Sequence, residues 1–441
     1  MMRIQLTRKP LFKSLLTGRW TQLLLRALML AGLVFTILAG LLGTPVGSHN
    51  FAIIVVWIAW WTALKLIFIP FGGRSWCSIC PIPLPGEWLQ RGGITRTVAR
   101  RFGLNLRLHR WLRGTWLQSG GFLLVGLFGA VTLTSASITA WVLLSALALA
   151  TALSPVFERR AFCNALCPIG GFTGLYARLA PVELRVIDRP TCIAHRQKSC
   201  YDACPWGVYP FALKHNGPCG LCMECVRACP YDNLAINLRP FGADMQPRNP
   251  LRIDEVFLAL VMLGSVLLFS AIFLGPWGDL KAAAYAIGQT EWFLLSGAFL
   301  AFLLVLFPAI FLFAVRLSAG RSSKSIPLKT LLGKQAQLLL PVGLTSWVAF
   351  TISFALAKSS YVLPVLSDPF GWGWRLLGNV QDASASLERA ALTQLLIALV
   401  ICTGLFWTGR IARQQGALRG SLPVLLFCLL FSFVLLWLLV G

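Results

Sequence analysis

Long apolar runs dominate the hydropathy pattern of this chain, and the polar residues gather in the segments between them. Several runs reach the roughly 20 residues that an α-helix needs to cross a bilayer. They predict about nine membrane-spanning helices. The expected ranges are 22–42, 51–71, 117–134, 138–155, 254–276, 292–317, 335–357, 389–409 and 421–440. We therefore expect a polytopic α-helical membrane protein with a cysteine-rich segment inserted between spans four and five.

Composition and charge agree with a membrane protein. Hydrophobic residues make up 57% of the chain and charged residues only 12%, about half the charged fraction of a soluble domain. The net charge of +24 comes from alternate loops that are rich in Lys and Arg, and the positive-inside rule explains it without a nucleic-acid partner. The rule places the N-terminus and every cysteine motif on the cytoplasmic side of a bacterial inner membrane. The basic segments are 1–20, 72–116, 157–252, 316–334 and 410–419.

One cysteine motif carries a strong chemical signal. The stretch from Cys219 to Pro230 reads C-x2-C-x2-C-x3-C-P, the spacing that wraps cysteine thiolates around an iron–sulfur cube. A zinc site would instead pair two CxxC turns across a longer loop. In the two-cluster ferredoxin layout, the fourth cysteine ligates the other cluster. The cysteines expected on the first [4Fe–4S] cluster are Cys204, Cys219, Cys222 and Cys225.

The second ferredoxin site is one cysteine short. Cys229 would join Cys192 and Cys200, so the site holds a cube with a non-cysteine ligand, a three-iron cluster or no cluster. His195 and Asp202 are candidate ligands, although a histidine on a basic loop is more often simply solvated. We expect two clusters, because the spacing Cys200-x3-Cys204-Pro205 has little other use.

A shorter motif occurs twice, each time after a pair of predicted spans. Arg74-Ser-Trp-Cys77-Ser-Ile-Cys80-Pro-Ile and Arg160-Ala-Phe-Cys163-Asn-Ala-Leu-Cys167-Pro-Ile share the same order of residue types. Such a repeat predicts two equivalent helical hairpins that bring four thiols together at the membrane surface. Four thiolates hold a cluster or a soft metal ion; redox CxxC pairs and buried structural thiols are the simpler alternatives. Proline after the second cysteine fits the first position of a helix, where the helix dipole lowers a thiol pKa.

These motifs together resemble the NapH/MauN, NosR and YccM-type membrane polyferredoxins over about residues 20–240. Cys163-x3-Cys167-Pro-Ile-Gly-Gly-Phe-Thr-Gly-Leu-Tyr is similar to the family's second motif, whereas Cys77 and Cys80 are one residue closer than the family's first motif. The resemblance implies a membrane electron-transfer component, rather than a stand-alone enzyme, that relays electrons between a cytoplasmic donor or quinone pool and a redox partner. The alternative is a maturation factor that binds or reduces copper or another soft metal at Cys77, Cys80, Cys163 and Cys167.

The motifs divide the chain into three expected parts. Residues 1–156 form a four-span part with the first Cys-Pro motif, 157–250 the cytoplasmic ferredoxin-like domain, and 251–441 a five-span part without an assigned role. No histidine lies at the centre of a predicted span, so a transmembrane haem is not expected. Lys65 lies inside the second span, where a lysine usually snorkels toward the headgroups, and Cys402 and Cys428 are expected to be packing residues.

Overall fold

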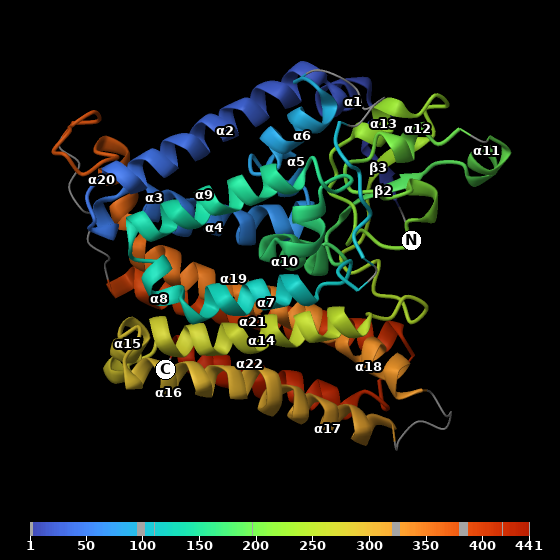
Figure 1. The fold of residues 1–441 in the computed structure, drawn as a ribbon. Coiled ribbons are helices and arrows are strands. Elements are labelled where there is room, and N and C mark those ends of the chain that lie inside the picture. Colours follow the sequence, from blue (N-terminus) through green and yellow to red (C-terminus); the bar gives the residue numbers. More distant parts are fainter. Residues whose placement is uncertain are drawn as a thin grey trace. The chain divides into compact units, whose positions relative to one another are not determined.

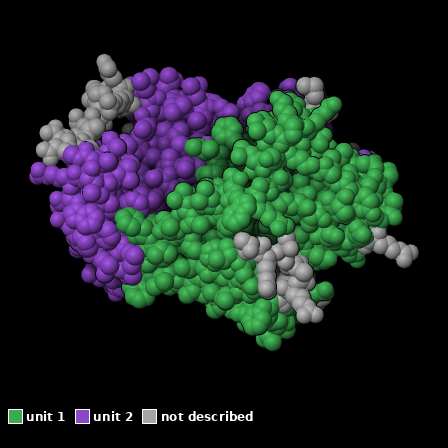
Figure 2. All heavy atoms as spheres, turned by 90° about the horizontal axis from the view of Figure 1, so that it is seen from above, with its two compact units in different colours: residues 1–37, 67–118, 141–244 green, residues 38–66, 119–140, 245–441 purple. Residues whose placement is uncertain are grey.

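The computed structural model describes residues 3–94, 102–109, 111–195, 197–319, 327–378, 387–416 and 418–440. Parts of all five predicted basic segments lie outside the described residues, at 1–2, 95–101, 110, 196, 320–326 and 417. The chain forms two compact units, coloured in Figure 2. Unit 1 comprises residues 1–37, 67–118 and 141–244, and unit 2 comprises 38–66, 119–140 and 245–441. The division into 1–156, 157–250 and 251–441 stays a prediction.

The protein is largely helical (Figure 1). Within the described residues, eight helices are long and apolar enough to cross a membrane. An apolar helix suits lipid because it satisfies its backbone hydrogen bonds internally. These spans are Arg19–Leu42 (α2), Phe51–Gly72 (α3 to η4), Ala136–Leu153 (α9), Ile253–Phe273 (α14), Thr290–Ala319 (α16 to α17), Leu328–Ser367 (α18 to α20), Ala391–Gln414 (within α21, Leu387–Gln414) and Leu422–Val440 (α22).

The third predicted span takes a shorter, interrupted form. It consists of α7 (Trp116–Leu127) and α8 (Gly129–Thr132), separated by Phe128. Backbone bonds of the helical type continue through the interruption, because Phe128 donates to Leu124 and Thr132 donates to Phe128. Together, α7 and α8 are only about as long as the shortest helix that can cross a bilayer. The prediction of a ninth span depends on this pair of helices.

The candidate span Phe51–Gly72, whose residues 51–66 belong to unit 2, contains an unusual lysine environment. Most of this span has π-helical hydrogen bonding, in η3 (Ile54–Trp60) and η4 (Leu64–Gly72), which often marks a functional position. Lys65 is fully buried, and its Nζ lies 4.5 Å from the ring centroid of Trp61 and 4.4 Å from that of Trp347. The expectation that Lys65 snorkels was wrong, because cation–π contacts hold the side chain inside the unit.

The remaining elements are short and lie mostly in unit 1. The helices are α1 (Pro10–Thr17), α5 (Trp76–Ile79), α6 (Leu84–Arg91), α10 (Pro168–Tyr176), α11 (Arg189–Ala194), α12 (Ser199–Asp202), α13 (Glu224–Ala228) and, in unit 2, α15 (Gly278–Tyr285). Short 3-10 or π turns are η1 (Leu6–Arg8), η2 (Gly47–His49), η5 (Phe162–Leu166), η6 (Pro210–Ala212), η7 (Phe302–Leu306) and η8 (Ser359–Tyr361).

An antiparallel sheet in unit 1 connects the N-terminal segment to the cysteine-rich segment. Its strand order is β1-β3-β2, from Ile4–Gln5, Leu234–Leu238 and Val182–Val186. Ile4 pairs with Leu238, and Val182 pairs with the same residue on the other side. One face of the sheet buries apolar side chains against the cysteine loop, and Figure 1 shows β2 and β3 beside α12 and α13. The buried members of this core are Leu184, Cys219, Leu221, Met223, Cys225, Val226, Leu234 and Ile236.

Candidate metal centre

The four cysteines predicted for the first cluster line one small cavity. Cys204, Cys219, Cys222 and Cys225 all contribute to its wall, together with Trp206 and residues of the sheet core. Burial raises the pKa of Cys225, and the thiols of Cys219, Cys222 and Cys204 raise it further. We call these four residues the middle group. The sequence spacing therefore identified a set of thiols that the fold brings together.

The backbone on both sides of Cys222 has an unusual conformation. Leu221 and Met223, which flank Cys222, have φ values of 51° and 61°, in the left-handed region. When neighbouring residues alternate between right-handed and left-handed backbone conformations, their N–H groups form a concave array. Such arrays bind anions, including the sulfur atoms of iron–sulfur sites. Such backbone strain persists only where packing enforces it, and both side chains are buried in the sheet core.

The three cysteines predicted for the second site also meet, and we call Cys192, Cys200 and Cys229 the outer group. Burial raises the pKa of Cys200, and the neighbouring Cys229 and Cys192 raise it further. Asn233 links two members: its backbone N–H donates to Cys229 Sγ at 3.4 Å and its side chain to Cys192 Sγ at 3.3 Å. Asn233 is a member of the site that the cysteine spacing did not reveal.

The side chains near the outer group include two aromatic neighbours, His195 and Tyr209. The ring of His195 stacks on that of Tyr231, with centroids 4.6 Å apart. Tyr209 is a further neighbour: burial raises the pKa of its phenol, and the thiols of Cys200 and Cys192 raise it further. Tyr209 lies four residues after Pro205, beyond the end of the Cys200–Pro205 motif, so the cysteine spacing did not predict it as a neighbour of the site.

The repeated Cys-Pro motifs converge as the repeat predicted, and Cys77, Cys80, Cys163 and Cys167 form the membrane-motif group. Burial raises the pKa of Cys163, and the thiols of Cys167, Cys80 and Cys77 raise it further. Pro168 is the first residue of α10, and Gly170 N–H donates to Cys167 Sγ at 3.4 Å. The first motif differs, because α6 begins at Leu84 rather than directly after Cys80.

The expectation that helix starts depress these thiol pKa values was wrong. Burial raises the pKa of Cys167 to about 11, although the Gly170 N–H lowers it in part. Burial and the nearby Cys77 raise the pKa of Cys80 to about 12. Desolvation disfavours a thiolate more than one backbone N–H favours it. Without a bound metal these thiols are protonated at neutral pH, so loading a cluster releases protons.

Trp206 connects the middle and membrane-motif groups through one buried core. Trp206 belongs to the same buried core as Cys204 and Cys222 of the middle group and Cys77 and Cys163 of the membrane-motif group. Close packing extends to the loop, because a Cβ added at Gly220 would lie 2.1 Å from Trp206 Nε1. The two thiol groups thus share one buried core that includes an aromatic side chain.

Two repeat-related arginines contact this tryptophan. The guanidinium carbon of Arg74 lies 4.2 Å from the Trp206 ring centroid, and that of Arg160 lies 5.3 Å away. Arg74 also donates to Gly217 O at 2.9 Å and Arg160 to Cys77 O at 2.6 Å. Each arginine precedes a Cys-Pro motif in the sequence, so the repeat predicted that the two residues are equivalent. The repeat did not predict that both contact Trp206.

Glu87 is a buried acidic residue that motif analysis missed. It forms an ion pair with Arg160 and lies 3.9 Å from Arg91. Burial alone would raise the pKa of Glu87, but Arg160 and Arg91 lower it to about 2. The sequence could have indicated Glu87, because it is a single carboxylate in a largely apolar turn after the first Cys-Pro motif. Acidic residues are scarce in this chain, which has only 15 of them.

The donor set fits clusters better than a single metal ion. Among the described residues, no three or more His, Cys, Asp and Glu side chains are placed to hold one ion. In a cluster each thiolate bonds a different iron, so the ligands are spread more widely than around one ion. The sets of four, four and three buried or partly buried cysteines are consistent with that spread.

Fold and site together define a polytopic membrane protein with ferredoxin-type cysteine sites. The chain matches the 4Fe-4S binding domain family over residues 53–105 and 139–186. Each matched segment contains one Cys-Pro motif of the membrane-motif group. The match and the relatives described next support assignment of the chain to the MauN/NapH-type polyferredoxins.

Two relatives are methylamine utilization ferredoxin-type proteins MauN. The protein of Paracoccus denitrificans is 30% identical over 160 residues, which cover 32% of this chain and 52% of the relative. The protein of Methylorubrum extorquens is 28% identical over 174 residues, covering 35% and 55% respectively. The chain thus spans about half the length of the curated relatives it matches. No solved structure gave a significant match.

Proposed function

We propose that this protein is a membrane-bound electron-transfer component in which three cysteine groups act in series. It relays electrons between a cytoplasmic donor or the quinone pool and a redox partner protein. The observation that carries the proposal is the common buried core of Cys77, Cys163, Cys204 and Cys222 around Trp206. Cys200 and Cys229 of the outer group pack in turn against the core that holds Cys219 and Cys225. The proposed order is outer, middle and membrane-motif group.

An iron–sulfur cluster would supply reversible one-electron storage at each group. The protein's own residues hold the thiolates, exclude water and set the local charge. Arg160 acts on both neighbouring groups, since its charge interacts with Cys163 and with Cys222. Backbone N–H groups also donate to sulfur, as Val208 does to Cys204 Sγ at 3.4 Å. Positive charge and N–H···S bonds favour the more negative, reduced state and raise the reduction potential.

The 4Fe-4S family match favours a cluster over a lone metal ion at the membrane-motif group, because it falls on the two segments that carry those cysteines. Anaerobic purification followed by iron, sulfide and copper analysis tests this assignment. Three occupied groups give about 11 or 12 irons and matching acid-labile sulfide per chain, whereas two occupied groups give about 8 irons. Absence of sulfide would overturn the proposal, and copper that is lost in Cys167→Ser would favour the metal-handling alternative.

Single substitutions test the serial arrangement. Cys222→Ser removes one proposed ligand from the middle group, and Cys167→Ser removes one from the membrane-motif group. Cys402→Ser is the control, because it removes an exposed thiol that belongs to none of the three groups. We expect each of the first two variants to lose one EPR signal and to block quinol-dependent reduction of an acceptor. Cys402→Ser should keep both. Unchanged electron flow in Cys167→Ser would exclude the membrane-motif group from the relay.

We infer that the N-terminus and the cysteine segment lie on the cytoplasmic side and that α7 with α8 crosses the membrane. Pairing of Ile4 with Leu238 supports placing both ends of the first four predicted spans on one side of the membrane, and that placement would require an even number of crossings. Three long helices lie between them, so a fourth crossing is needed. In unit 2, Val46 pairs with Ser135, which supports placing the two intervening turns on the opposite side.

A further inference from the structure

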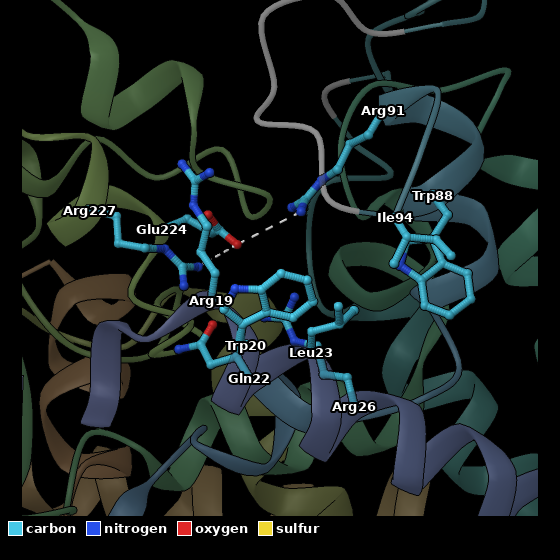
Figure 3. A pocket seen from close by; sticks show the side chains of 10 residues that line it. All are labelled: Arg19, Trp20, Gln22, Leu23, Arg26, Trp88, Arg91, Ile94, Glu224 and Arg227. Carbon is cyan, nitrogen blue, oxygen red and sulfur yellow. Dashed lines mark ion pairs between the residues drawn. The ribbon is translucent and has the colours of Figure 1, made fainter. Parts of the chain in front are cut away.

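A positively charged cavity in unit 1 lies apart from the cysteine cavity. Its volume is about 200 Å³. Figure 3 shows side chains of α2, α6 and α13 converging on it, with a dashed line from Arg91 to Glu224. Its lining residues comprise four arginines, one glutamate and two tryptophans among others: Arg19, Trp20, Gln22, Leu23, Arg26, Trp88, Arg91, Ile94, Glu224 and Arg227.

The charges in this cavity are not balanced. Glu224 is the single acidic lining residue, and it lies 2.7 Å from Arg227 and 3.8 Å from Arg91. Arg26 uses its Nε to donate to Ser78 O at 3.0 Å. Arg19 has neither an ion pair nor a side-chain hydrogen bond within the described part of the chain. The four lining guanidinium groups and the one lining carboxylate sum to about +3 at neutral pH; Glu87 lies 3.9 Å from Arg91 but outside the lining, where it also pairs with Arg160.

The cavity lies at the first residues of a candidate membrane span, where lipid headgroups are expected. Arg19 is the first residue of the candidate span Arg19–Leu42, and Trp20 beside it is 77% exposed, as expected for an aromatic at the membrane interface. One to two turns further along α2, large apolar side chains are exposed where acyl chains would lie. These are Leu24, Leu25 and Leu28.

We propose that this cavity binds the phosphate headgroup of an anionic phospholipid, with the acyl chains along the exposed leucines of α2. Guanidinium groups bind phosphate oxygens through paired N–H donors, and basic pockets at the cytoplasmic ends of spans bind acidic lipids. A bound headgroup would join α2 and α6 to α13, which carries Glu224 directly after Cys222–Met223. The lipid would thereby fasten the middle-group loop to the membrane surface. This binding is independent of the proposed electron transfer.

The test uses the full chain in detergent and compares Arg19→Gln with a matched control. Arg19 makes no ion pair that the fold depends on, so this variant is expected to fold. Arg107→Gln also removes one charge from unit 1, but Arg107 lies outside the cavity and is mostly exposed. Added phosphatidylglycerol, phosphatidylcholine and inorganic phosphate are the three probes. Retained lipid is counted by native mass spectrometry, and stability is followed by thermal unfolding.

Phosphatidylglycerol should stay bound to the wild type and raise its unfolding temperature, whereas phosphatidylcholine should do neither. Arg19→Gln should weaken phosphatidylglycerol binding about fivefold, the factor for one arginine near an anionic surface, and Arg107→Gln should leave it unchanged. Equal weakening in both variants would overturn the site. Stabilisation by inorganic phosphate as strong as by phosphatidylglycerol would overturn the lipid assignment in favour of a free anion.

Discussion

At the scale of single residues, buried charge organises the cysteine sites more than motif spacing suggests. Glu87 and Arg160 are nearly inaccessible to solvent, and Arg160 also donates to the carbonyl of Cys77. A buried arginine without its carboxylate is costly because the remaining charge is desolvated. The ion pair therefore fixes the arginine that contacts Trp206.

We predict that Glu87→Gln destabilises the protein by about 3 kcal/mol at neutral pH, the cost associated with the depressed pKa of Glu87. The folded pKa of about 2 lies below the ordinary 4.5. The contribution is therefore full above about pH 4.5 and is lost as the pH falls toward 2. Thermal unfolding of both proteins should give a difference at pH 7 that shrinks by pH 3.

Glu158→Gln is the matched control for this prediction. Glu158 lies 4.0 Å from Arg107, whose side chain is 78% exposed, and such surface pairs contribute about 1 kcal/mol or less. Equal destabilisation by Glu158→Gln and Glu87→Gln, or a pH-independent difference for Glu87→Gln, would contradict the structural role of the buried pair.

Gly220 offers a second residue-scale prediction. A methyl group there would collide with the Trp206 indole, and overpacking of this kind costs about 1–3 kcal/mol. We expect Gly220→Ala to lower the iron content of the middle group, and Trp206→Phe to restore part of it in the double variant. Gly32→Ala serves as the control, because a Cβ at Gly32 meets nothing within 4 Å. Full iron loading of Gly220→Ala would refute the tight contact.

At the scale of elements, local patterns predicted the thiol sets but not their connection. The spacing of Cys219, Cys222 and Cys225 is a property of one loop, and the repeat predicted that the two Cys-Pro motifs meet. Trp206 lies 43 residues or more from Cys163 and Cys77 in sequence, and no local pattern reports such a contact. Lys65 shows the same limit, since hydropathy could not reveal the aromatic ring of Trp347, which a distant helix contributes.

The interrupted helix α7–α8 carries an element-scale prediction. If it crosses the membrane, the turn at Thr134 lies on the same side as the loop at Val46, opposite the cysteine segment. A protease site inserted after Thr134 should be cut in spheroplasts from outside. The same site inserted after Gln246 should be cut only after the membrane is opened. Protection of the Thr134 site would remove α7–α8 from the spans.

At the scale of the whole molecule, a small sheet ties together segments that the membrane helices separate in sequence. β3 lies between β1 and β2, Ile236 N–H donates to Thr7 Oγ1 at 3.3 Å, and Arg3 lies 2.8 Å from Glu183. The sheet also forms one wall of the core that buries the middle group. Hydropathy alone predicted the N-terminal segment as a basic loop and missed this role.

We predict that deletion of residues 3–8 exposes the edge of β3 and loosens the cysteine core. Iron release to a chelator, followed by visible absorbance, should become several-fold faster than in the intact protein. Arg3→Gln removes only a half-exposed ion pair, which contributes about 1 kcal/mol or less, and should leave the rate within about twofold. Unchanged iron release after the deletion would mean that β1 does not support the core.

The pairing of Ile4 with Leu238 also has a consequence for biosynthesis. At about 5–20 residues per second, the ribosome needs roughly 10–50 s to make the chain between these two strands. During that time the first spans enter the bilayer while β1 has no partner. The N-terminal segment must then stay on the ribosome's side of the membrane and near the exit site. A bulky N-terminal fusion should therefore impair maturation more than the same fusion at the C-terminus.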